Sequence, residues 1–150
     1  MNALEMLEAI IAVGPAHRDP ELLAHVSKSS GHYNINKRIE FENGGSISVQ
    51  ASEPTYCTPR NNTGPYTAVE VGFPEGVHLP DSWESHADYW PRDEDDKTWR
   101  NSNVFGWVPV ELIRELILAN CPKLKAILEH AECNLLTASE RKDWFNNILR

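Results

Sequence analysis

The most unusual chemistry in this sequence lies in the acidic tract, residues 81–96, where carboxylates alternate with large aromatic side chains. Seven of its sixteen residues are Asp or Glu, and four of these form an unbroken run at 93–96. Carboxylates of this kind pair with Lys and Arg of a partner, while Trp and Tyr anchor protein interfaces. The alternative is a solvated loop whose aromatic residues hold it to the core. As a partner-binding surface, the tract and its flank contribute Trp90, Asp93, Glu94, Asp95, Asp96 and Trp99.

A second candidate surface is the long loop at 52–65, which is rich in Pro, Asn and Gly. Long loops without regular structure are often functional. Tyr56 and Arg60 in this loop, and Tyr66 just after it, are residue types that dominate interface energies. The alternative is that these side chains pin the loop by hydrogen bonding to backbone carbonyls. We take Tyr56 and Arg60 as candidate partner-binding residues.

Catalytic interpretations have less support. Cys57 lies three residues before Arg60, and a nearby cation favours the nucleophilic thiolate, although a packed loop thiol explains the same residue. His78 and His86 could join nearby aspartates in a mixed metal site, but their spacing matches no known ligand pattern. No nucleophile elbow, Walker loop, zincin motif or dinucleotide fingerprint is present in the sequence. We therefore assign no catalytic residue, metal or cofactor.

The overall charge points to the kind of partner. Fourteen Lys and Arg stand against 22 Asp and Glu, which gives a formal net charge of −8. Binding to nucleic acid or to an anionic membrane needs clustered Lys and Arg, and the densest basic stretch is only Lys37–Arg38. No stretch approaches the roughly 20 apolar residues of a membrane span. We expect a basic protein or a nucleoprotein complex as partner, with no direct contact to nucleic acid or membrane.

The cysteines and the first residues indicate the compartment. The three cysteines form no CxxC pair, which is typical of buried thiols kept reduced. Glu5 and Glu8 lie where a signal peptide would carry Lys or Arg. We expect a cytoplasmic protein.

The elements that must position these residues follow from periodicity. Apolar residues at helical spacing predict a helix over 3–13, and Asp19–Pro20–Glu21 predicts the start of a second helix running to about Lys28. Alternating residues on both sides of Asn43–Gly44 predict a hairpin with Ile39, Phe41, Ile47 and Val49 inward.

Further strands and helices complete the pattern. Strands are predicted at 66–73, with Val69, Val71 and Phe73 on one face, and at 104–108. A helix beginning at Pro109 buries Leu112, Ile113, Leu116 and Ile117, and shorter helices follow at 123–130 and after the capping box at 137–140. This order predicts one α+β domain over 1–150, in which N-terminal and C-terminal helices pack on one face of a three- or four-stranded antiparallel sheet.

Separated blocks within residues 44–118 carry a resemblance to known sequences. The blocks at 46–52, 56–60, 66–74 and 104–110 resemble small uncharacterised proteins encoded by bacterial phages and prophages. The resemblance carries no catalytic motif, and no residue role transfers with it. It implies an inhibitor of a host defence system, such as an anti-CRISPR protein, acting in the cytoplasm of the bacterial host.

The sequence thus favours a non-enzymatic inhibitor that binds its target through an acidic surface. Two alternatives stay open: an immunity or antitoxin-like protein that neutralises a basic toxin, and a small enzyme that uses Cys57 or the region of His78 and His86. A homodimer through the apolar C-terminal helices also remains an alternative.

Overall fold

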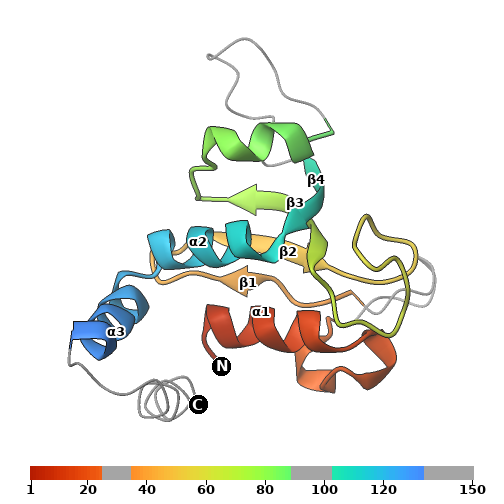
Figure 1. Cartoon of the computed structure of the whole chain (residues 1–150), viewed down its shortest axis with the longest axis horizontal. Helices are drawn as coiled ribbons and strands as arrows, with labels where there is room; N and C mark the ends of the chain where they lie inside the picture. Colours follow the sequence, from red (N-terminus) through yellow and green to blue (C-terminus); the bar gives the residue numbers. More distant parts are fainter. Residues whose placement is uncertain (25–34, 89–102, 134–150) are drawn as a thin grey trace.

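Four antiparallel strands in the order β1-β2-β3-β4 form the centre of the fold. A computed structural model describes residues 1–24, 35–88 and 103–133 of the chain (Figure 1). The strands are β1 (Ile39–Glu40), β2 (Ser46–Gln50), β3 (Ala68–Glu75) and β4 (Val104–Pro109), and the α-helices are α1 (Ala3–Ala12), α2 (Val110–Asn120) and α3 (Pro122–Cys133). Short 3-10 helices lie in the connections of the described part: η1 (Pro15–His17), η2 (Pro20–Leu22) and η4 (Asp81–His86). The α+β prediction is confirmed, with four strands in the sheet.

The β1–β2 hairpin forms where the sequence predicts it. Gly44 has a φ of +89°, a conformation that favours glycine, and the side chain of Asn43 accepts a hydrogen bond from the Gly45 N–H at 2.9 Å. Ile47 pairs with Ile39 across the hairpin, and both side chains are fully buried. The hairpin therefore directs one apolar face toward the helices.

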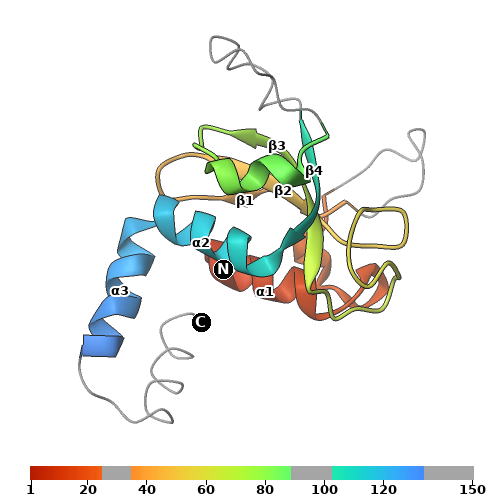
Figure 2. The same cartoon turned by 45° about the horizontal axis from the view of Figure 1, so that its top comes forward.

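The helices cover that apolar face. α1 and α2 lie side by side against the sheet (Figure 2), and their buried side chains join those of β2, β3 and β4 in one core. η4 contributes Trp83 to this core. Its ring packs edge-on against that of Phe105 in β4, with the ring centroids 5.6 Å apart. Trp83 therefore anchors the described start of the acidic tract to the core, as its aromatic content predicts.

Long-range contacts fix the helices. Arg114 of α2 donates a hydrogen bond to Glu8 of α1 at 2.7 Å and also pairs with Glu111. Its hydrogen bond to Glu8 is the main reason that the pKa of Arg114 lies above its ordinary value. At α3, the Glu42 carboxylate accepts hydrogen bonds from the backbone N–H groups of Lys123 and Leu124, at 2.8 and 3.2 Å. A residue 81 positions away in sequence therefore caps the N-terminus of α3.

Two bulges interrupt the sheet. Gly106 and Trp107 of β4 lie opposite the single residue Glu70, because Val69 pairs with Val108 and Val71 with Phe105. In β3, Phe73 and Pro74 lie opposite Ile47 in the same way. Phe73 and Trp107 both have a φ of +50°, which is the left-handed region, and they are 47% and 49% exposed. The prediction that Phe73 shares the face of Val69 and Val71 is wrong, because the bulge turns its side chain to solvent.

The predicted helix beginning at Pro20 is also wrong in its described part. Asp19 caps a turn by accepting from the Glu21 N–H at 2.9 Å, but the turn ends at Leu22. Leu23 then pairs with Asn36, and the Ala24 N–H donates to the carbonyl of Ile35 at 2.8 Å. Antiparallel pairing therefore replaces the helix as the source of backbone hydrogen bonds. The remainder of that predicted helix and the helix predicted after 137 lie outside the described residues.

The C-terminal helices otherwise follow the prediction with small shifts. α2 begins at Val110, so Pro109 precedes the helix rather than occupying its first position. Its buried residues are Val110, Ile113, Leu116 and Ile117, while Leu112 is only half-buried. None of the helices in the described ranges has the length and apolar character needed to cross a membrane.

Arg18 joins α1 to the end of the sheet from a buried position, being only 5% exposed. Its guanidinium donates to the Ile10 carbonyl at 3.0 and 3.2 Å, to the Ala51 carbonyl at 2.7 Å and to the Asn36 side chain at 3.3 Å. Burial lowers the pKa of Arg18 below its ordinary value, and the interactions with Tyr66 and Cys57 act in the opposite direction. These hydrogen bonds tie the first helix to the residue that follows β2.

We expect Arg18→Met to lower the free energy of unfolding by about 3 kcal/mol, because two buried carbonyl groups lose their donor. Urea unfolding followed by circular dichroism measures the change. Arg114→Met is the matched control and should cost about 1 kcal/mol or less, because Arg114 pairs with exposed carboxylates. Equal losses in the two variants would contradict the structural role of Arg18.

Candidate functional site

Tyr56 and Trp107 form an exposed aromatic pair. Their ring centroids lie 4.8 Å apart with an angle of 26° between the ring planes, which is a stacked arrangement. Tyr56 is 37% exposed and Trp107 is 49% exposed, so both rings retain surface for a partner. Arg60 completes the group, because its guanidinium carbon lies 5.6 Å from the centroid of the Tyr56 ring. We call Tyr56, Arg60 and Trp107 the aromatic site.

Contacts from β3 and β4 hold Tyr56 and Trp107 next to each other. The bulge gives Trp107 its left-handed φ of +50°, and its N–H donates to the Tyr56 carbonyl at 3.0 Å. Gly106 allows this approach, because a Cβ atom at that position would lie 3.1 Å from the Cβ atom of Tyr56. On the other strand, the Glu70 carboxylate accepts a hydrogen bond from the Tyr56 N–H at 2.9 Å. Two strands thus fix the residue that stacks on Trp107.

Arg60 borders a surface depression of about 590 Å³ that Glu53, Pro54 and Asn62 also line. The Nε atom of Arg60 donates to the Glu53 carbonyl at 3.1 Å. Asn62 donates to the Glu53 carboxylate at 3.2 Å and accepts from the Glu53 N–H at 2.8 Å. The depression therefore has a hydrogen-bonded wall, and it shares Arg60 with the aromatic site.

The loop that carries Tyr56 and Arg60 is tied to the core. Cys57 is 1% exposed, and its Sγ atom lies 3.2 and 3.4 Å from the carbonyl oxygens of Ser52 and Pro59, either of which can accept its single S–H. The hydroxyl of Tyr66 donates to the Asn61 carbonyl at 2.8 Å. Gly14 contacts the far side of the loop so closely that an added Cβ would lie 1.5 Å from the Asn62 carbonyl oxygen. This packing fixes the loop in one conformation.

Tyr66 is therefore a structural residue rather than an interface residue. It is 3% exposed, and burial is the main cause that raises the pKa of its phenol above the ordinary value. The nearby Arg18 guanidinium acts in the opposite direction, and its carbon lies 5.8 Å from the ring centroid. The phenol stays protonated at neutral pH and serves as a hydrogen-bond donor to the loop.

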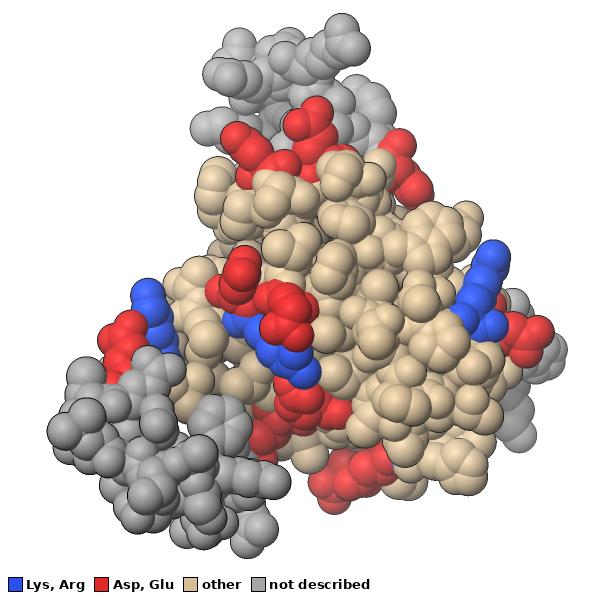
Figure 3. Space-filling view, viewed as in Figure 1, with Lys and Arg blue, Asp and Glu red and all other residues tan. Residues whose placement is uncertain are grey.

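Of the eight predicted partner-binding residues, two lie in the described part of the chain. The structure brings Tyr56 and Arg60 together, whereas six predicted residues lie outside the described part: Trp90, Asp93, Glu94, Asp95, Asp96 and Trp99. The described start of the acidic tract exposes Asp81, Glu84 and Asp88. Figure 3 shows carboxylates gathered over η4 on this face of the molecule, at the described start of the tract.

Trp107 is the residue that sequence analysis missed. The sequence places Gly106 directly before it within a predicted strand, and an isolated glycine in a strand often marks a bulge or a close backbone approach. That signal was present, but the partner of the close approach, Tyr56, lies 51 positions earlier in the chain. Sequence spacing alone does not connect the two.

Two of the catalytic candidates, Cys57 and His86, make polar contacts with backbone carbonyls in the described region. Cys57 directs its thiol toward two loop carbonyls, and His86 places its Nδ1 atom 3.2 Å from the Gly106 carbonyl oxygen. Among residues 1–24, 35–88 and 103–133, no group of three or more His, Cys, Asp or Glu side chains is arranged to hold a metal ion. No family model, curated protein or solved structure matches the chain.

The left-handed backbone at Trp107 predicts an inverted preference between glycine and alanine. We expect Trp107→Gly to be more stable than Trp107→Ala by about 1 kcal/mol, because only alanine is strained at positive φ. Thermal or urea unfolding of the two variants measures the difference directly, since both variants lack the indole ring.

Val104 provides the control, because it lies in the same strand outside the bulge. There Val104→Ala should be more stable than Val104→Gly by about 0.5–1 kcal/mol. The same order at positions 104 and 107 would show that the bulge does not hold Trp107 in the left-handed region.

Proposed function

We propose that this protein acts by binding another protein, and that the aromatic site is the centre of its recognition surface. The observation that carries the proposal is Trp107, a large aromatic residue held half-exposed at positive φ and stacked on Tyr56. Positive φ is costly for a bulky residue, and such residues cluster at functional sites. Phe73 has the same φ and a similar exposure, so the stack on Tyr56, which also carries Arg60, is what distinguishes Trp107. Trp, Tyr and Arg are also the residue types that contribute most to binding energy at interfaces.

The packing around the aromatic site supports tight binding. Ordering flexible side chains on association costs about 0.5–1.5 kcal/mol for each one. The Tyr56 ring is stacked on Trp107 and its backbone N–H and carbonyl are both hydrogen-bonded, while the Arg60 side chain donates from its Nε atom to the Glu53 carbonyl. Much of this cost is therefore met when the protein folds, and the site reaches a partner already ordered.

Charge favours a basic partner. The chain has a net charge of −8, and Asp81, Glu84 and Asp88 are exposed at the described start of the acidic tract. The tract continues in sequence with Asp93–Asp96, so its carboxylates would attract Lys and Arg on the partner and raise the association rate.

We propose further that the protein acts without catalysis, as a phage-encoded inhibitor of a bacterial defence complex of the CRISPR type. The support for this target is the resemblance of residues 44–118 to phage and prophage proteins, together with the acidic charge. A defence complex that binds nucleic acid presents basic surfaces, and an acidic protein can cover them. The sulfur of Cys57, the candidate nucleophile, is buried against the loop carbonyls of Ser52 and Pro59.

Affinity capture with matched variants tests the aromatic site. Tagged wild-type protein, Trp107→Gly and Phe73→Gly are incubated with lysate of a bacterium that expresses a CRISPR effector complex, and captured proteins are quantified. We expect Trp107→Gly to lose tenfold or more of the captured effector, because it removes a central anchor. Phe73→Gly should capture it normally, since Phe73 is equally exposed at the same φ but lies in a different bulge.

Equal capture by wild type and Trp107→Gly would contradict the assigned surface, and equal losses in both variants would contradict its specificity. Recovery of a basic toxin in place of an effector complex would overturn the proposed target.

Replacing Asp93, Asp95 and Asp96 with Ser tests the electrostatic part. We expect weaker capture at low salt and a smaller difference from wild type at about 0.5 M salt, where screening removes most of the attraction. Binding measured by surface plasmon resonance should place the change mainly in the association rate. An unchanged rate at low salt would exclude the acidic tract from recognition.

A further inference from the structure

The turn of the β1–β2 hairpin carries the one Asn–Gly step of the sequence, Asn43–Gly44. Asparagine is chemically labile in proteins, because the backbone nitrogen of the next residue can attack its side-chain amide carbon. A side chain on that next residue hinders the attack, and glycine has none. Asn43 and Gly44 are both exposed, and a Cβ atom added at Gly44 would meet no atom within 4 Å outside its chain neighbours. The turn is therefore open to water at the residues that react.

Hydrogen bonds restrain the reacting groups. The Gly44 N–H donates to the Phe41 carbonyl at 3.0 Å, and the Asn43 Oδ1 atom accepts from the Gly45 N–H at 2.9 Å. The Asn43 Nδ2 atom donates to the Oδ1 atom of Asn120, the last residue of α2, at 2.6 Å. The side-chain amide reaches the Gly44 nitrogen only when these bonds open. Asn120, 77 positions away in sequence, therefore slows the reaction.

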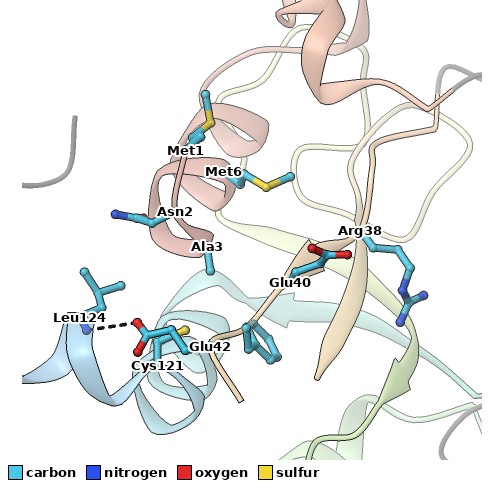
Figure 4. A pocket seen from close by; sticks show the side chains of 10 residues that line it. Met1, Asn2, Ala3, Met6, Arg38, Glu40, Glu42, Cys121 and Leu124 are labelled. Atoms are coloured by element: carbon cyan, nitrogen blue, oxygen red, sulfur yellow. Dashed lines mark hydrogen bonds between the residues drawn. The ribbon is translucent and has the colours of Figure 1, made fainter. Parts of the chain in front are cut away.

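The same turn holds the junction of α2 and α3. Glu42 accepts the backbone N–H groups of Lys123 and Leu124 at the start of α3, and Figure 4 shows its carboxylate beside Leu124. The next residue, Asn43, donates to Asn120 at the end of α2. Adjacent residues of the turn thus bind the helices on both sides of the junction.

We propose that Asn43 is a site of deamidation, and that its conversion separates the hairpin from the junction of α2 and α3. The Gly44 nitrogen forms a bond to the Cγ atom of Asn43, and ammonia leaves with the Gly44 proton, which gives a cyclic imide. Water then adds to an imide carbonyl and breaks its bond to nitrogen. Cleavage at Cγ leaves aspartate, whereas cleavage at the main-chain carbonyl leaves isoaspartate, whose main chain is longer by a methylene group. The net reaction consumes water and releases ammonia.

Either product lacks the donor on which the contact with Asn120 depends. The Nδ2 atom of Asn120 donates to the Leu116 carbonyl at 2.8 Å, so its Oδ1 atom faces a carboxylate after the reaction. The last turn of α2 also carries partial negative charge, which repels that carboxylate. In isoaspartate the added methylene group lengthens the turn next to Glu42, and we expect the cap of α3 to be lost.

Ageing at mildly alkaline pH, followed by tryptic digestion and mass spectrometry, tests the site. Peptide 39–60 contains Asn43 as its only asparagine, whereas peptide 61–92 contains Asn61 and Asn62, neither of which precedes glycine. We expect peptide 39–60 to gain the mass of one amide-to-acid conversion and to become a substrate of an isoaspartyl methyltransferase. Peptide 61–92 should stay unchanged over the same time.

Asn43→Gln is the control for this site, because its longer side chain closes the imide ring slowly and should prevent the gain. Absence of conversion at Asn43, equal conversion in the two peptides, or the same gain in Asn43→Gln would overturn the assignment.

Matched variants test the protection by Asn120. Asn120→Ala should speed the conversion about fivefold, which corresponds to losing one hydrogen bond of ordinary strength. Asp19→Ala is the control and should leave the rate unchanged, since Asp19 caps η2, outside the hairpin and the helix junction. Equal rates in Asn120→Ala and wild type would overturn the protective role, as would an equal increase in both variants, which would indicate reaction through global unfolding.

Hydrogen exchange measures the consequence for α3. The converted protein carries an additional negative charge, so anion exchange separates it from the starting protein. We expect the Lys123 and Leu124 N–H groups to exchange at least about fivefold faster in the isoaspartate form, because their acceptor Glu42 lies next to the altered turn. The N–H groups of α1 should exchange as before. Unchanged exchange at Lys123 and Leu124 would overturn the proposed separation.

Discussion

The fold depends on one buried cation that is held by backbone carbonyls instead of a carboxylate. The Arg18 guanidinium donates hydrogen bonds to a carbonyl in the last turn of α1, to the carbonyl of the residue that follows β2, and to the Asn36 side chain. The carboxyl end of a helix carries partial negative charge, so the Ile10 carbonyl is a favourable partner for a guanidinium. Within the described ranges Arg18 forms no salt bridge, and its charge is spread over these carbonyl and amide oxygens. Three segments that are distant in sequence are thereby fixed to one another.

The arrangement of the aromatic site follows from this junction. The loop after β2 returns to α1, where the Gly14 N–H donates to the Thr63 carbonyl and the Tyr66 N–H donates to the Ile11 carbonyl. That return gives Tyr56 a fixed place beside the bulge of β4. Part of the outer edge of β4 is also occupied, because the Trp107 N–H donates to the Tyr56 carbonyl and the Val104 carbonyl accepts from the Asp88 N–H. A partner would therefore recognise this region through side chains rather than by adding a strand to the sheet.

The α3 helix shows the same reliance on distant partners. Its start is capped by Glu42, which fixes the helix against the β1–β2 hairpin. Glu42 also lines a cavity of about 350 Å³ together with Met6 and Cys121. The cavity and the aromatic site therefore form in different ways. The cavity lies where α3 meets the hairpin, whereas the aromatic site depends on the bulge that exposes Trp107 on β4. Each depends on a contact between segments separated by about 50 or more residues.

The sequence by itself determined the elements whose signals are local. Asn43–Gly44 specified the hairpin, and the spacing of Ile113, Leu116 and Ile117 specified the buried face of α2, because turn geometry and helical period act over a few residues. Residue type also led to the prediction of Tyr56 and Arg60 as partner-binding residues, and the structure places their side chains together. Only the tertiary structure decided the bulges that expose Phe73 and Trp107, the pairing of Leu23 with Asn36 in place of a helix, and the stacking of Tyr56 on Trp107. These features arise from strand register and from contacts between distant segments, and such energies are absent from any short window of sequence.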